Sequence, residues 1–252
     1  MIVDGLMLLG PNRFAPTLEV GEALAACDRI GVDCVVAAPA RPPDYHLEPA
    51  NERLAQAALD SDGRVAALGR VDPLNGERAA TEARRCLTDL GCVGLFLHPA
   101  EEAFPVVAAA PVVEVARQIG SPVVVATGYF GLSEPLQVAE LAERFLDVPF
   151  LLTSGGQINI SGLSMIDAWL ALRAHRNLHV MTNGEYRQDF IERLAAELDP
   201  GRVLYASFAP TFDPAFERER IRSARLTDEA RRAIEGQNAV RLFGLDGRGA
   251  LS

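Results

Sequence analysis

The sequence predicts an α/β protein that folds as a (β/α)₈ TIM barrel with an extra C-terminal helix. Three observations predict it: eight short apolar segments, an amphipathic segment after each of them, and a length of 252 residues. Most apolar segments are continuous Val, Leu and Ala runs, as expected for parallel strands covered on both faces. A doubly wound open sheet is the competing architecture, but it rarely needs eight strands in so short a chain.

The strands predicted from these segments follow one another along the whole chain. In order, they cover residues 2–4, 33–39, 65–72, 93–98, 123–127, 150–154, 178–182 and 203–207. A helical segment follows each strand, so the chain is a series of βα units.

Helical periodicity is clearest in three of the segments between the strands. Apolar residues recur at positions i, i+3, i+4 and i+7 from Ala83, from Val138 and from Ile191. Gly91 and Gly120 stand directly before the next strand, where glycines that end helices belong.

The last part of the chain continues the pattern. Residues 227–242 form one more amphipathic segment, which predicts the extra helix. The sequence contains no segment that resembles a linker. We therefore predict one barrel domain over residues 1–245 and a loose, Gly-rich tail over residues 246–252.

Charge and hydropathy limit the partners and the location of the protein. Lys and Arg number 24 against 34 Asp and Glu, which gives a net charge of −10. Such a surface repels phosphate backbones, so we expect no nucleic-acid partner. The N-terminal residues lack the basic segment of a signal peptide, and no apolar run reaches about 18 residues. We expect no membrane association and a cytoplasmic location.

The basic residues are all arginine, since the chain contains no lysine. A guanidinium group neither forms a Schiff base nor loses its proton in proteins. This excludes lysine-dependent aldolases, lysine-anchored PLP enzymes, P-loop NTPases and metal centres bridged by carbamylated lysine. The four cysteines show no C-x-x-C spacing and lie in apolar segments, so we predict buried free thiols.

Active sites of TIM barrels lie at the C-terminal ends of the strands, so polar residues there are candidates for function. His98 is the only one of the four histidines at such an end. It is a candidate general acid or base, or it only hydrogen-bonds a loop. Asp4 could act as an acid with a raised pKa, or it bonds backbone amides. We interpret Arg70 and Asp72 as a structural ion pair or turn.

The remaining candidates come from other strand ends. Glu185, which lies in the densest polar group at any strand end, completes the predicted catalytic set of His98, Asp4 and Glu185. Arg41 could bind a substrate carboxylate with both of its terminal nitrogens. We predict substrate contacts for six residues in all: Arg41, Tyr129, Ser154, Asn183, Tyr186 and Phe208.

Several fragments, in their order and spacing, resemble one family. They are LGRVDP, LGCVGLFLHP, PVVVATG, LLTSGG and GRVLYASFAP. Together they are similar to the compact, single-metal branch of the amidohydrolase superfamily. The resemblance covers nearly the whole chain. It implies a TIM barrel and an ancestry among metal-dependent amide and lactone hydrolases and decarboxylases of small, often aromatic, carboxylic acids.

The metal-binding positions of that family are replaced in this chain. The family begins with D-x-H-x-H, and Leu6 and Leu8 occupy the two histidine positions. The other ligands of the family align with Ala126, Ser154 and Phe208. A catalytic zinc-type site needs about three protein ligands with lone pairs, which these side chains do not supply. We predict no metal and no other cofactor. The apolar replacements either fill the barrel mouth or line a dry cavity.

Two functions remain open. The first is a degenerate, metal-free amidohydrolase-like protein that acts as a binding, structural or regulatory subunit. The alternative is a metal-independent enzyme of lyase, lactone-hydrolase or isomerase type that acts on a small aromatic or carboxylated compound. In that case His98, Asp4 and Glu185 would supply acid–base chemistry. The expected partners are such a ligand, and a second copy of the chain or a catalytically competent paralogue.

Overall fold

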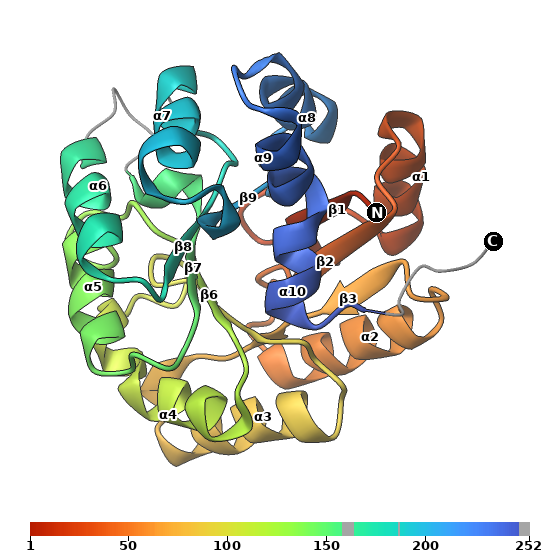
Figure 1. Cartoon of the computed structure of the whole chain (residues 1–252). Coiled ribbons are helices and arrows are strands. Elements are labelled where there is room, and N and C mark those ends of the chain that lie inside the picture. The colour runs from red at the N-terminus through yellow and green to blue at the C-terminus, as the bar shows by residue number, and fades with distance from the viewer. Residues whose placement is uncertain (158–163, 186, 247–252) are drawn as a thin grey trace.

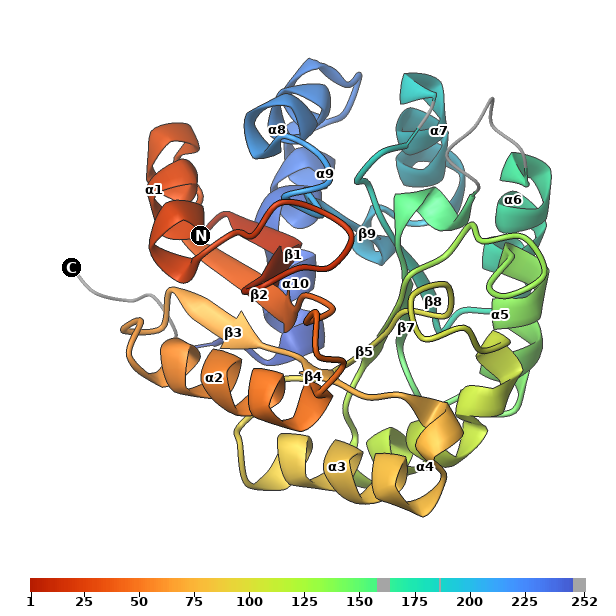
Figure 2. The same cartoon turned by 180° about the vertical axis from the view of Figure 1, so that it is seen from behind.

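The computed structural model describes residues 1–157, 164–185 and 187–246. Within these ranges, parallel strands form a barrel with helices around it (Figure 1, Figure 2). The strands are β1 (Val3–Leu9), β2 (Cys34–Pro39), β3 (Val65–Ala67), β4 (Gly69–Arg70), β5 (Leu95–Leu97), β6 (Val123–Val125), β7 (Phe150–Leu152), β8 (Leu178–Met181) and β9 (Val203–Leu204). Only Leu68 separates β3 from β4, which together form one barrel strand, so all eight predicted strands are present.

The helices lie outside the strands, as both views of the molecule show (Figure 1, Figure 2). They are α1 (Val20–Ile30), α2 (Leu47–Leu59), α3 (Glu77–Thr88), α4 (Ala110–Ile119), α5 (Pro135–Glu143), α6 (Met165–Ala174), α7 (Gln188–Arg193), α8 (Pro214–Ser223), α9 (Asp228–Arg232) and α10 (Asn238–Phe243). The periodic segments at Ala83, Val138 and Ile191 fall in α3, α5 and α7, so the helices predicted there are confirmed.

Hydrogen bonds close the barrel between its first and last strands. The amide of Gly5 donates to the carbonyl of Tyr205 at 2.9 Å, and the amide of Phe208 donates to the carbonyl of Leu6 at 2.8 Å. Met7 forms an additional parallel bridge with Ala209. The strand order β1 to β3 and β4 to β9 is therefore continuous around a ring, which is the predicted (β/α)₈ architecture.

Two apolar layers pack on the two sides of the strands. One fills the space between the strands and the helices. The other fills the inside of the barrel, and we call it the lumen cluster. Its buried members are Val3, Leu6, Leu8, Cys34, Val36, Ala38, Ala40, Ala66, Leu68, Phe96, Val124, Ala126, Leu151, Met181, Leu204, Ala206, Phe208, Ala239, Phe243 and Leu245. The barrel interior is thus a packed core and not a channel.

A break in register in β1 decides which side chains face the lumen. The pairing of β1 with β2 shifts between Asp4 and Met7. Asp4 pairs with Val35, which packs toward the helices, whereas Leu8 pairs with Ala38, which belongs to the lumen cluster. An extra residue in a strand reverses the face on which later side chains lie. Asp4 therefore faces the helices, while Leu6 and Leu8 face the lumen.

The C-terminal helical segment closes the end of the barrel at which the strands begin. It runs from α9 through a π-helical turn to α10, which confirms the predicted extra helix. Ala239 and Phe243 of α10, with Leu245, belong to the lumen cluster. Gly236 lies in the π-helical turn, where a Cβ atom would stand 2.1 Å from the carbonyl oxygen of Met1. The end of the described chain thus packs directly on its beginning.

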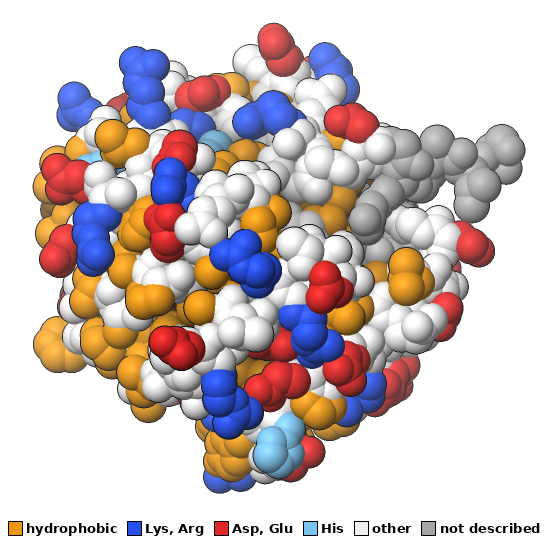
Figure 3. All heavy atoms as spheres, turned by 90° about the horizontal axis from the view of Figure 1, so that it is seen from below, with side chains coloured by type: hydrophobic (Ala, Val, Ile, Leu, Met, Phe, Trp, Pro, Cys, Tyr) orange, Lys and Arg blue, Asp and Glu red, His pale blue; other side chains and the backbone are white. Residues whose placement is uncertain are grey.

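The surface mixes both signs of charge. Figure 3 shows arginine and acidic side chains interspersed over the face formed by α3 and α4. The four cysteines are buried, and none of them forms a disulfide, as predicted. In the described part of the chain, no helix is long and apolar enough to cross a membrane. Asp246 is the last described residue, so the predicted loose tail lies almost wholly outside the described residues, and the single-domain assignment remains a prediction.

Candidate functional site at the barrel mouth

The positions that the sequence resemblance aligns with the family's metal ligands lie at the end of the barrel where the strands finish, which we call the mouth. Leu6, Leu8, Ala126 and Phe208 all belong to the lumen cluster, and none is more than 7% exposed. Their side chains contact one another or neighbouring apolar groups and not solvent. The mouth is therefore filled with hydrocarbon, which is one of the two expected outcomes.

Phe208 adopts an unusual backbone conformation at this point. Its φ of 57° lies in the left-handed region, which a bulky non-glycine residue rarely occupies. The ring nevertheless packs into the lumen, 6.5 Å from the ring of Phe96 between centroids. The apolar contacts of the ring, together with the hydrogen bond of its amide to Leu6, hold this strained conformation.

The side chains at these positions do not fit a catalytic metal ion. Leucine, alanine and phenylalanine have no donor atom, and the hydroxyl of Ser154 accepts a hydrogen bond from Asn183 Nδ2 at 3.3 Å. Among the described residues, no group of three or more His, Cys, Asp or Glu side chains could hold a metal. The chemistry of these side chains therefore does not fit a metal centre of the kind that the resemblance implies.

His98 lies at the mouth among aromatic rings, where the sequence placed it. Its ring is 5.2 Å from that of Tyr129 and 6.4 Å from that of Phe208. The structure thus brings together three of the predicted site residues. Tyr129 Oη is 3.4 Å from His98 Nε2, and burial raises the pKa of this tyrosine to about 12. The phenol therefore stays protonated near pH 7.

The hydrogen bonds of His98 fix its tautomer. Its Nδ1 accepts a hydrogen bond from the amide of Glu101 at 3.1 Å, so the ring proton belongs on Nε2. Burial, followed by the positive charge of Arg70, lowers the pKa of His98 well below its ordinary value. The imidazole is therefore neutral near neutral pH. It can donate from Nε2, but it is not a general acid that starts from imidazolium.

Beside His98, two buried arginines share one carboxylate. Arg41 Nη1 and Arg70 Nη2 each lie 2.7 Å from Oε1 of Glu102. Arg70 also bonds Glu101, and it donates to the carbonyl of Pro39 at 3.0 Å. We call these four charged residues, Arg41, Arg70, Glu101 and Glu102, the mouth ion cluster. The carboxylate that we expected at Arg41 is thus supplied by the protein's own Glu102.

Burial is the dominant influence on Glu102. The side chain is fully buried, and its Oε2 has no hydrogen-bond partner among the described residues. Burial raises the pKa of Glu102, although both arginines act against this. Within the part of the chain that the structure describes, Arg41 Nε and Arg70 Nε are also buried without partners. Unpaired donors beside a shared carboxylate are uncommon in native cores, and they leave hydrogen-bonding capacity that a ligand could use.

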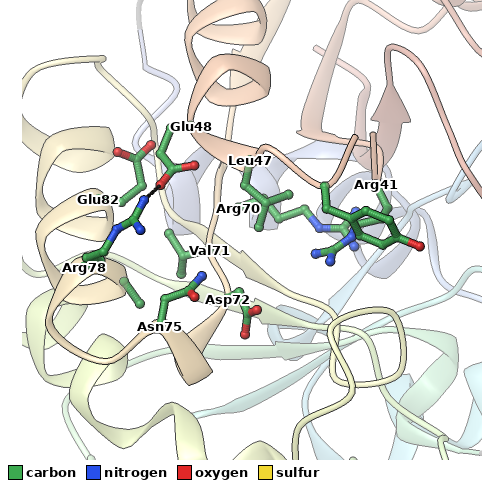
Figure 4. A pocket seen from close by; sticks show the side chains of 11 residues that line it. Arg41, Leu47, Glu48, Arg70, Val71, Asp72, Asn75, Arg78 and Glu82 are labelled. Carbon is green, nitrogen blue, oxygen red and sulfur yellow. Dashed lines mark hydrogen bonds and ion pairs between the residues drawn. The ribbon is translucent and has the colours of Figure 1, made fainter. Parts of the chain in front are cut away.

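A small pocket opens next to this cluster. Its volume is about 40 Å³, and both Arg41 and Arg70 line it. Figure 4 shows the two guanidinium groups side by side at one end of the pocket and the ion pair of Arg78 with Glu48 at the other. A space of this size admits one carboxylate group or a few water molecules.

The structure does not bring Asp4 to the mouth. Its Oδ1 accepts hydrogen bonds from the amides of Ser207 and Leu6, which is the second of the two roles considered for it. Its charge acts on Cys27 and Tyr205, both on the helix-facing side of the strands. Burial raises the pKa of Asp4 to about 6, as expected, but the carboxyl group faces away from the lumen. The register shift in β1, which the sequence does not signal, is the reason.

Glu185 belongs to a separate polar group at the ends of β7 and β8. It accepts a hydrogen bond from Gln157 Nε2, and burial raises its pKa to about 8. Ser154 and Asn183 bond each other nearby, through the amide of Ser154 and Asn183 Oδ1 at 3.3 Å. None of the hydrogen bonds of Glu185 involves His98 or Asp4, so the predicted catalytic set is not assembled as one unit. Tyr186 lies outside the described residues.

Sequence reasoning missed the acidic half of the mouth ion cluster. Of the two interpretations of Arg70 and Asp72, an ion pair or a turn, the structure shows the turn, since Asp72 caps it by accepting from the amide of Leu74. Glu101 and Glu102 lie one residue after the strand-end segment LHP. Two adjacent acidic residues at a strand end, opposite two arginines at other strand ends, were the available signal.

Comparisons with known proteins agree with this architecture. The family model described as Amidohydrolase matches residues 6–245. The structure resembles 5-carboxyvanillate decarboxylase from Sphingomonas paucimobilis, with 18% identity, a TM-score of 0.73, and coverage of 96% of this chain and 98% of that one. It also resembles 2,6-dihydroxybenzoate decarboxylase from Rhizobium, with 15% identity, a TM-score of 0.79, and coverage of 98% and 99%.

A third similar structure contains a metal ion and an inhibitor. It is a dihydroxybenzoic acid decarboxylase from Polaromonas sp. JS666 with bound manganese and 2-nitroresorcinol, with 14% identity, a TM-score of 0.79, and coverage of 100% of this chain and 99% of that one. At such low identities the likeness shows the fold, and the predicted TIM barrel is confirmed. None of the curated proteins matches the sequence.

Proposed function

The chain belongs to the amidohydrolase family, and from this premise we propose that it is a metal-free member that binds a small carboxylated compound at the barrel mouth. In this proposal the protein does not perform the metal-dependent chemistry of the family. It acts as a binding or regulatory component.

One observation carries the first half of the proposal, namely the hydrocarbon at the mouth. Leu6 and Leu8 are buried in the lumen cluster on the face where the family has imidazoles. Without a metal, no bound water reaches a pKa near 7 and no substrate carbonyl is polarised by a cation. Hydrolysis by the ancestral route therefore lacks both its nucleophile and its electrophilic assistance.

The mouth ion cluster supports the second half. Arg41 is positioned to exchange part of its contact with Glu102 for a ligand carboxylate, because its Nε has no partner and it lines the pocket. Aromatic surface lies beside it, since the ring of Tyr45 stacks on Arg41 at 4.7 Å. A related structure is named as a complex with 2,6-dihydroxybenzoate, which makes an aromatic carboxylate the first ligand to test.

A metal-independent enzyme is the second candidate. It is favoured by the names of the similar structures, which are decarboxylases of aromatic acids, and by one contact in the mouth. His98 Nε2 and Tyr129 Oη lie 3.4 Å apart, so a proton could pass between imidazole and phenol beside a bound acid. Asp4 has no part in this candidate because it faces the helices, and Glu185 would have to act from a separate group.

A titration of metal-stripped protein with 2,6-dihydroxybenzoate, followed by isothermal calorimetry, tests the proposal. We expect saturable binding that is unchanged by EDTA and at least tenfold weaker in Arg41→Gln. Arg78→Gln is the matched control, because Arg78 lines the same pocket but is 83% exposed. Binding that requires added manganese, or equal affinities in Arg41→Gln and the wild type, would contradict the proposal.

The same samples distinguish the two candidates. Release of carbon dioxide from the acid by metal-stripped protein, abolished in His98→Asn and in Tyr129→Phe, would establish the second candidate in place of the first. Binding without turnover would support the first.

We also propose a cytoplasmic location, supported by four buried cysteines that form no disulfide. Association with a second copy or with a competent paralogue stays a prediction, and size-exclusion chromatography with light scattering would test it.

A further inference from the structure

A second cavity lies at the opposite end of the barrel from the mouth, where the strands begin. Its volume is about 820 Å³, and we call it the basal cavity. Segments that are distant in sequence form its walls: the end of α6, the start of β8, the turn before β9, and α10, which crosses this end of the barrel (Figure 1). The residues that matter for the argument are Arg173, Arg176, His179, Arg202 and Arg241.

Positive charge collects in the basal cavity of a protein whose net charge is −10. Arg173 and Arg176 are exposed and, among the described residues, have no ion-pair partner. Arg241 donates only to a backbone carbonyl, that of Gly201 at 2.7 Å. Arg117, by contrast, is an exposed arginine that pairs with Glu114 at 2.7 Å.

The two acidic residues of the basal cavity are already engaged. Glu197 pairs with Arg193 at 3.1 Å, and Asp199 Oδ1 accepts a hydrogen bond from the amide of Gly201 at 2.7 Å. They therefore offset the four arginines only in part. The field in the cavity favours an anion.

Arg202 gives the cavity a rigid wall. Its Nε and Nη2 donate to the carbonyls of Leu172, His175 and Leu178 at distances between 2.6 and 2.8 Å. These bonds hold the guanidinium group in place and leave Nη1 for another partner. A guanidinium that is fixed before binding loses little entropy when an anion arrives.

His179 supplies the independent indication that a ligand belongs here. The residue is only 7% exposed, and its Nδ1 is buried with no hydrogen-bond partner among the described residues. Burial, followed by the nearby charges of Arg202 and Arg241, lowers its pKa to about 4, so the ring is neutral. A buried polar atom without a partner is uncommon in native proteins, and a bound water or ion is one of its explanations.

We propose that the basal cavity binds a small multivalent oxyanion. Arg173 and Arg176 close over its exposed groups, Arg202 and Arg241 face it from the walls, and His179 Nδ1 contributes one hydrogen bond. Phosphate and carboxylate groups share the geometry that arginine binds with two parallel hydrogen bonds, so both chemical sources fit. The cavity lies at the end of the barrel opposite the mouth, so this inference does not depend on the function proposed there.

Calorimetric titrations of the whole chain at pH 7 test the inference, with pyrophosphate in one arm and citrate in the other. Sodium chloride keeps the ionic strength constant. We expect saturable one-site binding in at least one arm, and the stronger arm identifies the source. The double variant Arg173→Ala/Arg176→Ala is expected to bind at least tenfold more weakly. The matched control is Arg29→Ala/Arg84→Ala, which removes the same charge from exposed positions on α1 and α3 and is expected to bind like the wild type.

A second measurement locates the site. The imidazole nitrogen signals of His179 in ¹⁵N NMR are expected to shift on saturation, while those of exposed His46 stay unchanged. No saturable heat in either arm, equal weakening in both double variants, or an unmoved His179 signal would each overturn the proposal.

Discussion

Arg70 shows what a single residue contributes at the barrel mouth. Its side chain is fully buried, contacts Glu101 and Glu102, and stacks over the ring of Phe96 at 5.4 Å. Asn51 holds the same residue through its backbone, accepting from its amide and donating to its carbonyl. Removal of one partner from a buried ion pair leaves the other charge without compensation.

We therefore expect Arg70→Met to lower the free energy of unfolding by about 3–5 kcal/mol. Urea denaturation followed by circular dichroism would measure it. Arg78→Met is the control, because Arg78 is 83% exposed and its ion pair with Glu48 spans 3.4 Å. The control should change stability by less than about 0.5 kcal/mol. Similar losses in the two variants would show that the mouth ion cluster does not stabilise the fold.

Glu185 should make stability depend on pH. Its pKa is raised to about 8 by burial, so between about 4.5 and 8 the folded state holds a proton that the unfolded state has lost. The stabilisation from this proton is complete below pH 4.5 and disappears as the pH rises through 8. Glu185→Gln removes the effect, since the amide stays neutral.

The expected result is that Glu185→Gln and the wild type are equally stable near pH 4.5. At pH 9 the variant should be more stable, by on the order of 2 kcal/mol. Urea unfolding at several pH values measures the difference. For Glu140→Gln, an exposed substitution on α5, the free energy of unfolding should depend on pH as it does in the wild type. A constant difference between Glu185→Gln and the wild type at all pH values would contradict the burial argument.

At the residue scale, the sequence predicted which residue types lie at the mouth better than it predicted which side chains they contact. The prediction that metal ligands are replaced rests on the identities of Leu6, Leu8 and Phe208, because side chains without donor atoms exclude coordination in any geometry. The partner of Arg41 was not visible, because Glu102 is 61 residues away in the chain. Which carboxylate reaches a given guanidinium is decided by how the strand-end loops pack.

At the scale of elements, β1 shows the limit of periodicity. The sequence suggested a short strand over residues 2–4, whereas β1 runs from Val3 to Leu9. Strict alternation would put Asp4 on the same face as Leu6 and Leu8, but the register shift separates them. A bulge depends on the hydrogen bonds of the neighbouring strand, so a pattern within one strand does not reveal it.

The contact of the C-terminal helical segment with the first strand gives a prediction at this scale. Gly236→Ala should lower the free energy of unfolding by at least about 2 kcal/mol, because its Cβ would overlap the carbonyl of Met1. Gly21→Ala, in the first turn of α1, meets nothing within 4 Å and should stabilise by about 0.5 kcal/mol. Thermal unfolding of both variants measures the contrast. Equal changes in stability for the two substitutions would mean that helix propensity alone, and not the contact with Met1, determines the effect of Gly236→Ala.

At the scale of the whole molecule, the architecture was predictable and the site only in part. Eight apolar segments in 252 residues specify a barrel, because parallel strands must be covered on both faces and must close on themselves. The same logic placed His98, Tyr129 and Phe208 together at the mouth, since strand ends converge there. The basal cavity was not predicted from the sequence, because the rule that active sites lie at the C-terminal ends of barrel strands concerns only one end of the barrel.

Closure of the barrel by α10 can be tested on the whole fold. Phe243 is 4% exposed and fills the lumen at the end where the strands begin. Phe243→Ala should lower the free energy of unfolding by about 3–5 kcal/mol through the cavity it leaves. Phe216→Ala, at a position that is 64% exposed, should change it by less than about 1 kcal/mol. Urea denaturation measures both changes in the free energy of unfolding. Equal changes in the two variants would mean that Phe243 does not stabilise the barrel.

The inward direction of Leu6, Leu8, Ala126 and Phe208 has a consequence for protein engineering. The backbone already aims four side chains into one confined space, so histidine at the first three positions and aspartate at the fourth would converge there without a new scaffold. These four substitutions would therefore place the donor atoms that the resemblance implies on the existing backbone, and metal binding by the variant could be measured.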